Sequence, residues 1–154
     1  MSKTEKIISR GYLSSAMGCR CPRCREGKLF QNGLSFHFKK TLLMNKTCPV
    51  CGQPTEIEVG FYYGTSYVSY AITVGLTITS FLLWWLIIGL SINDNRIFFW
   101  LGFNAVLLIA LQPWIMRLSR SFWISWFVKY DPDWKSHQPM DVSERMNAEQ
   151  EANW

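Results

Sequence analysis

Charged side chains are missing from two long stretches of this 154-residue chain. Residues 68–90 carry no charge over 23 positions, and residues 97–116 carry none over 20. A helix of about 20 apolar residues crosses the ~30 Å hydrocarbon layer of a membrane and satisfies its own backbone there. The sequence therefore predicts two transmembrane spans, at about 68–90 and 97–116, joined by a polar hinge into an antiparallel hairpin. The alternative is a buried hairpin in a soluble protein, but the remaining chain is small to cover one.

The lack of ionisable groups in these spans also excludes functions. No Asp, Glu, Lys, Arg or His lies within either one, and proton relays and ion pathways usually need such a residue. The chain shows no phosphate-binding loop, no paired carboxylates at membrane depth and no nucleophile with a base nearby. We therefore expect neither a transporter acting alone nor an enzyme, and we assign no catalytic and no cofactor-binding residue.

Small residues recur along the first span at every fourth position, as Ala71, Gly75 and Thr79. Such a stripe lets another helix approach closely, and Gly102 and Ala105 offer a matching surface on the second span. We predict that the stripe packs within the hairpin, with contact to another protein as the alternative. The hairpin region as a whole covers residues 61–116.

The segment that follows the second span is amphipathic. Residues 117–130 place aromatic side chains on one helical face and Arg or Ser on the other, which predicts a separate C-terminal helix lying in the membrane interface. A kink at Gln112-Pro113 would separate it from the span. The alternative is one long, tilted second helix. Residues 131–154 read as a polar, solvated tail.

Positive charge is distributed unevenly about the two spans. The chain holds 16 Lys and Arg against 11 Asp and Glu; ten of the basic residues precede the first span and only Arg96 lies in the hinge. Basic residues favour the cytoplasmic side of a membrane. The pattern predicts a multi-pass membrane protein with both termini cytoplasmic. Because no apolar stretch precedes residue 67, the first span is expected to act as an uncleaved anchor.

Four of the five cysteines form two close pairs, Cys21-Pro22-Arg23-Cys24 and Cys48-Pro49-Val50-Cys51. Two CxxC pairs at this separation predict one tetrahedral structural zinc ion, with Cys21, Cys24, Cys48 and Cys51 as the metal ligands. An iron site and redox thiols are the alternatives that use the same residues. A disulfide is not expected in the reducing cytoplasm. We predict that Cys19 is a spare thiol and that His37 is not a ligand.

The segment around these cysteines is too short to fold on its own apolar core. Roughly 45 residues need a staple, and zinc contributes on the order of 10–16 kcal/mol in small zinc peptides. Residues 34–38 and 55–59 alternate apolar and polar side chains, which predicts short β-strands. The expected fold is thus a small zinc ribbon at residues 19–60, after a basic N-terminal segment at 1–18. A closed four-sulfur shell leaves no position for catalytic water.

These motifs together resemble a family. The stretch CPRCREGKLF, then CPVCG, then FYYGTSYVSYA leading into two spans with an NDNR hinge is similar to a family of small bacterial membrane proteins that is known as a domain of unknown function. The resemblance covers about residues 19–130. It implies a cytoplasmic zinc ribbon on two transmembrane helices in the bacterial inner membrane, with the four paired cysteines as ligands. It implies no activity. Arg25 departs from the glycine that many zinc knuckles carry there.

The expected function is that of a membrane-anchored zinc-ribbon adaptor, a small accessory subunit or assembly factor of a membrane complex. Its partners would be the lipid bilayer and a membrane protein, and a homo-oligomer remains open. Metal trafficking or thiol redox chemistry is the first alternative. Nucleic-acid binding is the second, since the first 46 residues carry ten basic and two acidic side chains, although anionic lipid explains the same charge.

Overall fold

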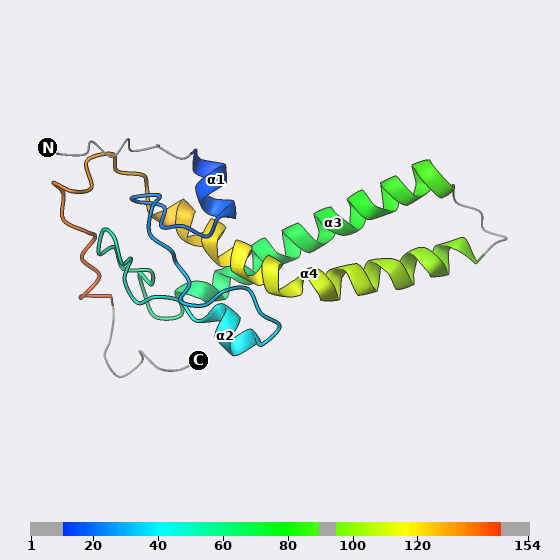
Figure 1. Ribbon diagram of the computed structural model, residues 1–154, viewed down its shortest axis with the longest axis horizontal. Coiled ribbons are helices and arrows are strands. Elements are labelled where there is room, and N and C mark those ends of the chain that lie inside the picture. The colour runs from blue at the N-terminus through cyan, green and yellow to red at the C-terminus, as the bar shows by residue number, and fades with distance from the viewer. Residues whose placement is uncertain (1–10, 90–94, 146–154) are drawn as a thin grey trace, which may run out of the picture.

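Two long helices lie side by side and carry the short elements at one end. In the computed structural model, residues 11–89 and 95–145 are described. Figure 1 shows the arrangement, in which the connecting segments and short helices gather around the base of the hairpin. In chain order the elements are α1 (Tyr12–Met17), α2 (Phe38–Leu42), the 3-10 helix η1 (Phe61–Gly64), α3 (Thr65–Ile88) and α4 (Arg96–Phe127).

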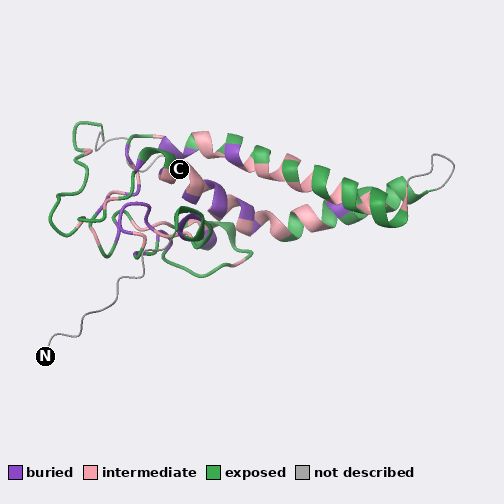
Figure 2. Ribbon diagram, turned by 90° about the horizontal axis from the view of Figure 1, so that it is seen from above, coloured by how far each residue is buried: buried purple, intermediate pink, exposed green. Residues whose placement is uncertain are grey.

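Both long helices are long and apolar enough to cross a membrane. One runs through η1 and α3 and the other is α4. Figure 2 shows that the half of the hairpin away from the short elements is largely exposed, while buried residues gather near its base. The hinge expected at 91–96 falls mostly on residues 90–94, which lie outside the described part of the chain. Two apolar helices with bare outer surfaces agree with the predicted pair of spans.

A few polar and aromatic contacts join α3 to α4. The Ser80 hydroxyl donates to Asn104 Oδ1 at 2.9 Å, and Trp100 Nε1 donates to Ser80 Oγ at 3.4 Å. The ring of Phe81 meets the ring of Trp100 edge-on, with 5.1 Å between their centroids. Polar groups inside a membrane hairpin usually find partners on the neighbouring helix. These contacts therefore fix which faces of the two helices meet.

The predicted role of the small-residue stripe within the hairpin is wrong. Ala71, Gly75 and Thr79 are all exposed, and a Cβ added at Gly75 or at Gly102 would meet nothing within 4 Å. The helices instead meet through polar side chains such as Ser80 and Asn104 and through aromatic rings. Gly75 and Thr79 lie on an exposed strip of α3, while Ala71 borders a groove that Phe122 and Trp126 of α4 also line.

The predicted interfacial helix at 117–130 is also wrong as a separate element. Helix α4 continues through Pro113 for 32 residues and ends at Phe127. Proline removes one backbone hydrogen bond, but the following turns are held by contacts with the cysteine-bearing segment. Leu118, Ser121 and Ile124 are buried there. One long second helix, the alternative interpretation, is what the structure has.

The predicted β-strands are absent from residues 11–89 and 95–145. Only isolated antiparallel bridges occur there, at Arg20–Lys28, Phe30–Met44 and Thr47–Pro54. Residues 31–43 form an excursion whose backbone bonds to side chains, since the Thr41 hydroxyl bonds to both Ser35 O and Ser35 N. A ladder needs a neighbouring strand with free backbone groups, and none is offered. The alternating apolar residues of 34–38 are consequently exposed or helical, so the ribbon architecture itself is not seen.

The cysteine-bearing segment and the helical hairpin share one core. We call residues 19–60 the cysteine module. Its buried side chains, Cys21, Cys24 and Cys48 among them, form a single cluster with Ile124 of α4, with Val128 and with Phe61 and Tyr62 of η1. Burial of apolar surface is the main favourable term in folding. The module and the end of α4 are therefore expected to fold as one unit.

Hydrogen bonds from α4 reinforce this junction. Arg117 Nη2 donates to Asn32 O at 2.7 Å and Arg120 Nη1 donates to Leu42 O at 3.0 Å. The Ser121 hydroxyl donates to Ala16 O at 2.7 Å. The bonds from Arg117 and Arg120 satisfy carbonyl groups of a segment without β-ladders, while Ala16 O also accepts from the amide of Cys19. Side chains of α4 thus replace the backbone partners that a β-ribbon would have supplied.

Candidate metal centre

Two backbone turns of the same design carry the four paired cysteines. We call residues 21–27 the first knuckle and residues 48–53 the second knuckle. The amide of Arg25 donates to Cys21 O at 2.8 Å, and the amide of Gly52 donates to Cys48 O at 3.0 Å. Both residues adopt positive φ, 60° for Arg25 and 70° for Gly52. The residue after each CxxC pair thus takes a left-handed conformation that glycine adopts easily.

A second set of backbone bonds closes each knuckle. The amide of Cys21 donates to Gly27 O and that of Cys48 to Gln53 O, both at 2.8 Å. The amide of Gly27 also points at Cys24 Sγ, at 3.5 Å. A Cβ at Gly27 would lie 2.2 Å from Cys48 Sγ. Glycine is therefore required at position 27 so that the first knuckle can approach the sulfur of the second.

The four sulfur atoms are brought together at a spacing that suits a metal ion. Cys21 Sγ lies 3.7 Å from Cys51 Sγ, and Cys24 Sγ lies 3.7 Å from Cys48 Sγ. All four sulfurs lie within 4.8 Å of one another. A tetrahedral site with metal–sulfur bonds of about 2.3 Å has sulfurs roughly 3.8 Å apart, whereas a disulfide needs about 2.05 Å. The donor set fits one metal ion held by four thiolates.

Without a metal, the four thiols share protons. Hydrogen bonding from Cys21 lowers the pKa of Cys24 to about 6 and also lowers the pKa of Cys48. Hydrogen bonding to Cys24 raises the pKa of Cys21, and the pKa of Cys51 is raised by the same network. In each knuckle one cysteine has a raised pKa and the other a lowered pKa. A bound metal cation would displace the protons from the thiols that are still protonated, because the metal binds thiolates.

The two other residues considered near the site lie outside it. Cys19 is half-buried, and burial raises the pKa of its thiol; it is not among the four clustered sulfurs. His37 is exposed and precedes α2. The structure thus brings together the four predicted ligands and no further described cysteine or histidine.

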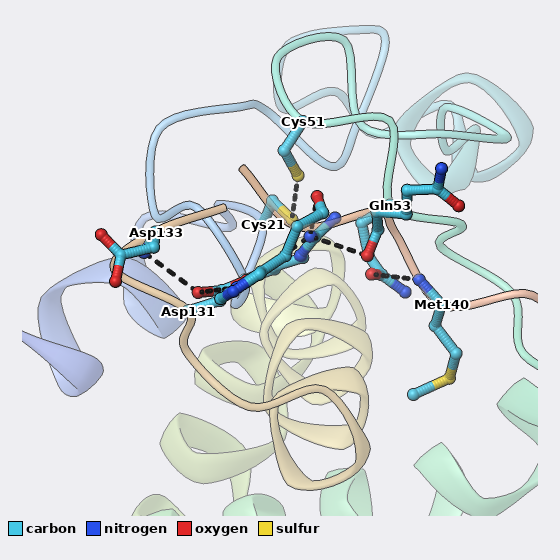
Figure 3. Close-up of polar contacts among 9 residues, drawn as sticks. Cys21, Cys51, Gln53, Asp131, Asp133 and Met140 are labelled. Carbon is cyan, nitrogen blue, oxygen red and sulfur yellow. Dashed lines mark hydrogen bonds and ion pairs between the residues drawn. The ribbon is translucent and has the colours of Figure 1, made fainter. Parts of the chain in front are cut away.

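The C-terminal segment, which sequence reasoning treated as a solvated tail, holds the first knuckle. Arg23, between the paired cysteines, is only 5 % exposed. Its Nη2 donates to His137 O at 2.7 Å and Gln138 O at 2.9 Å, and its own carbonyl accepts from the amide of Asp131 at 3.1 Å. Figure 3 shows Asp131 and Met140 of this segment around Cys21, Cys51 and Gln53.

The same segment then reaches the second knuckle. The amide of Met140 donates to Gln53 Oε1 at 3.3 Å, and Pro139 lies 3.8 Å from where a Gly52 Cβ would stand. Trp134 and Val142 pack on the buried core. Residues 131–142 therefore pack against both knuckles, which the solvated-tail interpretation did not predict, although most of their side chains are exposed. Two sequence signals indicated this packing: an arginine inside a CxxC pair, and apolar residues in an otherwise polar C-terminal segment.

Asp131 ties this segment to the first knuckle by charge. Its Oδ2 lies 3.5 Å from Arg23 Nη2 and 3.0 Å from His137 Nδ1. Desolvation acts to raise the pKa of Asp131, but hydrogen bonds from His137, Asp133 N–H and Arg23 outweigh it, so the pKa is lowered. Because the pKa of the Asp131 carboxyl is lowered, the ionised carboxylate stabilises the fold at pH values above the ordinary carboxyl pKa. That contribution is lost as pH falls through the lowered pKa.

Comparisons of the chain with protein-family models, with curated proteins and with solved structures find no match. The metal centre is therefore argued from its own geometry: two matched knuckles, four converging sulfurs and a shared core with α4. The resemblance to a family of small bacterial membrane proteins stays a prediction.

Proposed function

We propose that this protein is a membrane-anchored zinc adaptor, a small accessory subunit or assembly factor of a complex in the bacterial inner membrane. The observation that carries the proposal is the shared core, in which Cys21, Cys24 and Cys48 pack with Ile124 and Val128 at the end of α4. A metal centre built onto the end of an apolar helix holds a folded surface at a set position beside the membrane. The chain would cross twice and leave both termini in the cytoplasm.

Zinc in a structural role fits the cysteine cluster best. Four thiolates close the coordination shell, whereas catalytic zinc keeps one position open. Three of the four sulfurs belong to buried residues, and buried thiolates are poorly reached by an exchanging thiol. Both features favour a resident ion that stabilises the module over a cargo ion in transit.

The outward stripe on α3 supports a partner within the membrane. Ala71, Gly75 and Thr79 are exposed, and small residues let a second helix approach closely. Because nothing in the described chain lies within 4 Å of a Cβ added at Gly75, this part of the strip is open to another membrane protein or to a second copy of the chain. The absence of a charged residue from the spans agrees with a packing role.

The test is a matched pair of substitutions that leave the isolated chain intact. Gly75→Leu and Gly102→Leu each enter open space, so neither is expected to change zinc content or expression. The tagged protein at native abundance is purified in mild detergent and analysed by mass spectrometry. We expect the protein to purify with a membrane complex in a fixed ratio. Gly75→Leu should dissociate this complex, and Gly102→Leu should preserve it. A chain that purifies alone with bound zinc would contradict the adaptor function.

Topology has its own test. A reporter fused at the C-terminus should be cytoplasmic, and one inserted at residues 93–95 should be on the opposite side. A cytoplasmic signal from both positions would contradict two crossings without bearing on the metal centre.

Metal exchange is the second candidate, because Cys51 is only half-buried while the other three ligands are buried. A cargo site would release zinc to a competing chelator within minutes and expose alkylatable thiols. A resident ion keeps its stoichiometry under the same treatment, and all four ligand thiols stay unmodified.

A further inference from the structure

A basic cavity of about 350 Å³ lies between the cysteine module and α4, apart from the metal centre. Its lining includes Arg20 and Lys28 of the module and Trp114 and Arg117 of α4, with Met17 and Leu34 also on its wall. None of the residues that line this cavity is acidic. Three cations around one hollow without a carboxylate produce a positive potential that attracts an anion.

Two of the cations are held opposite each other by the backbone. Arg20 and Lys28 form an isolated antiparallel bridge, and residues paired in this way place their side chains on the same face. Like charges directly opposite each other on paired strands are destabilising. Arg20 Nη1 donates to the carbonyl of Glu26 at 2.6 Å. A bound anion between the two side chains would turn this repulsion into attraction.

The third cation is positioned by its other contacts. Arg117 Nη2 donates to Asn32 O at 2.7 Å, and its guanidinium carbon lies 4.3 Å from the centre of the Phe30 ring. The Nε atom of Arg117 is shielded from solvent and has no hydrogen-bond partner in the described chain. The contacts with Asn32 and Phe30 therefore hold the guanidinium in place at the wall of the cavity.

We propose that this cavity binds the phosphate group of an anionic membrane phospholipid. Arg117 directly follows the uncharged residues 97–116, so it lies at headgroup level when the hairpin spans the bilayer. Met17 and Leu34, more than half exposed, add apolar surface to the same cavity. Guanidinium and ammonium groups bind phosphate by charge-assisted hydrogen bonds. The proposal rests on the membrane insertion in the proposed function and not on the adaptor role.

Native mass spectrometry of the full-length, zinc-loaded protein in detergent tests the site. The probes are short-chain phosphatidylglycerol, phosphatidylcholine of the same chain length and inorganic phosphate. We expect one phosphatidylglycerol to be retained at concentrations where phosphatidylcholine is not, with no displacement by inorganic phosphate. Lys28→Gln should weaken retention about fivefold, since one basic residue near an anionic surface contributes about that factor. The double variant Arg20→Gln/Lys28→Gln should weaken it by roughly the square of that factor.

Lys39→Gln is the matched control, because it removes the same charge from an exposed position of α2 outside the cavity. Equal effects of Lys28→Gln and Lys39→Gln would overturn the site in favour of general charge attraction. Equal retention of phosphatidylcholine would overturn it too, and displacement by inorganic phosphate would assign the cavity to a soluble phosphate ligand. Alkaline extraction of membranes reports insertion separately. An inserted protein without lipid selectivity fails this inference alone.

Discussion

The two knuckles share the CxxC turn, differ by one residue in length and are completed in different ways. In each, the amide of the first cysteine donates to a carbonyl at 2.8 Å, and the residue after the second cysteine has positive φ. In the first knuckle the residue before the second cysteine is Arg23, 5 % exposed; in the second it is Val50, 42 % exposed. The left-handed residue is Arg25 in one and Gly52 in the other. The metal geometry is therefore set by the backbone, and the side chains serve other purposes.

The purpose of the first knuckle's side chains is tertiary contact. Arg23 reaches the carbonyls of His137 and Gln138, and the guanidinium of Arg25 lies 3.8 Å from the centre of the Tyr130 ring. A cation over an aromatic ring contributes about 0.5–1 kcal/mol at an exposed site. The first knuckle is thus held by the chain that follows α4. The second knuckle relies more on its own glycine.

The largest effect is expected from a substitution that removes a metal ligand, because both knuckles depend on the same metal ion. Replacing Cys48 with Ser removes one of the four sulfurs, and metal binding contributes on the order of 10–16 kcal/mol in small zinc peptides. We expect loss of bound zinc, measured by elemental analysis, and rapid proteolysis of the cysteine module. Cys19→Ser, which changes a thiol outside the cluster, should keep one zinc per chain. Equal zinc contents in both variants would contradict the ligand assignment.

Zinc binding should weaken steeply as pH falls, because protons compete for the same sulfurs. The raised pKa values of Cys21 and Cys51 mean that each knuckle gives up a proton on binding, so the affinity should drop about a hundredfold per pH unit near neutrality. Below pH of about 6, protonation of Cys24 should steepen the slope. Chelator competition across this pH range measures the slope of zinc affinity against pH. A slope of one proton or fewer would show that the two knuckles do not release one proton each.

A methyl group at Gly27 should separate the two knuckles. The added Cβ would meet Cys48 Sγ at 2.2 Å, and overpacking of this kind costs about 1–3 kcal/mol. We expect Gly27→Ala to weaken zinc binding roughly tenfold or more in chelator competition. Gly33→Ala enters open space and serves as the control. A Gly27→Ala variant with unchanged affinity would mean that the first knuckle can move away freely.

Arg23→Gln should release the C-terminal segment from the first knuckle. The substitution leaves the carbonyls of His137 and Gln138 without their donor, which costs about 1–3 kcal/mol. We expect faster protease cleavage within residues 131–142 while zinc remains bound. Val50→Gln tests the corresponding position of the second knuckle, where an exposed side chain should make the change neutral. Similar cleavage rates for both variants would remove the asymmetry proposed for these two positions.

The smallest effects should come from the left-handed residues. Gly52→Ala places a side chain at φ 70° and should cost about 1–2 kcal/mol. Arg25→Gly relieves strain at φ 60° but loses the contact with Tyr130, so its stability should change by less than about 0.5 kcal/mol. Thermal unfolding of the zinc-loaded protein distinguishes them. A larger loss for Arg25→Gly would mean that the cation–aromatic contact dominates the first knuckle.

What the sequence predicted well is local in the chain. The two apolar helices follow from uncharged runs, and the knuckles follow from CxxC spacing, because neighbouring residues decide both. The strands were wrong because a strand depends on a distant partner, and Thr41, Asn32 and α4 satisfy that backbone instead. The role of residues 131–142 was missed for the same reason, since Arg23 and Asp131 are separated by 108 positions.

The hairpin shows a similar limit. A small-residue stripe indicates where a helix can approach, but spacing alone does not say whether that helix belongs to the same chain. Proline at position 113 indicated a break, yet the helix continues beyond it, where Ser121 bonds to Ala16 of α1 and Ile124 packs in the core of the module. In both cases the deciding interaction lies outside the local pattern.

The continuity of α4 has a geometric consequence. Its 32 residues measure about 48 Å at 1.5 Å each, more than the ~30 Å of a bilayer core. The remaining length lies at the C-terminal end of α4, which packs against the cysteine module. Each residue inserted into this part of α4 would rotate the module by about 100° around the helix axis and shift it by about 1.5 Å along that axis. The length of this one helix can thus determine the orientation of the cysteine module around the axis of α4.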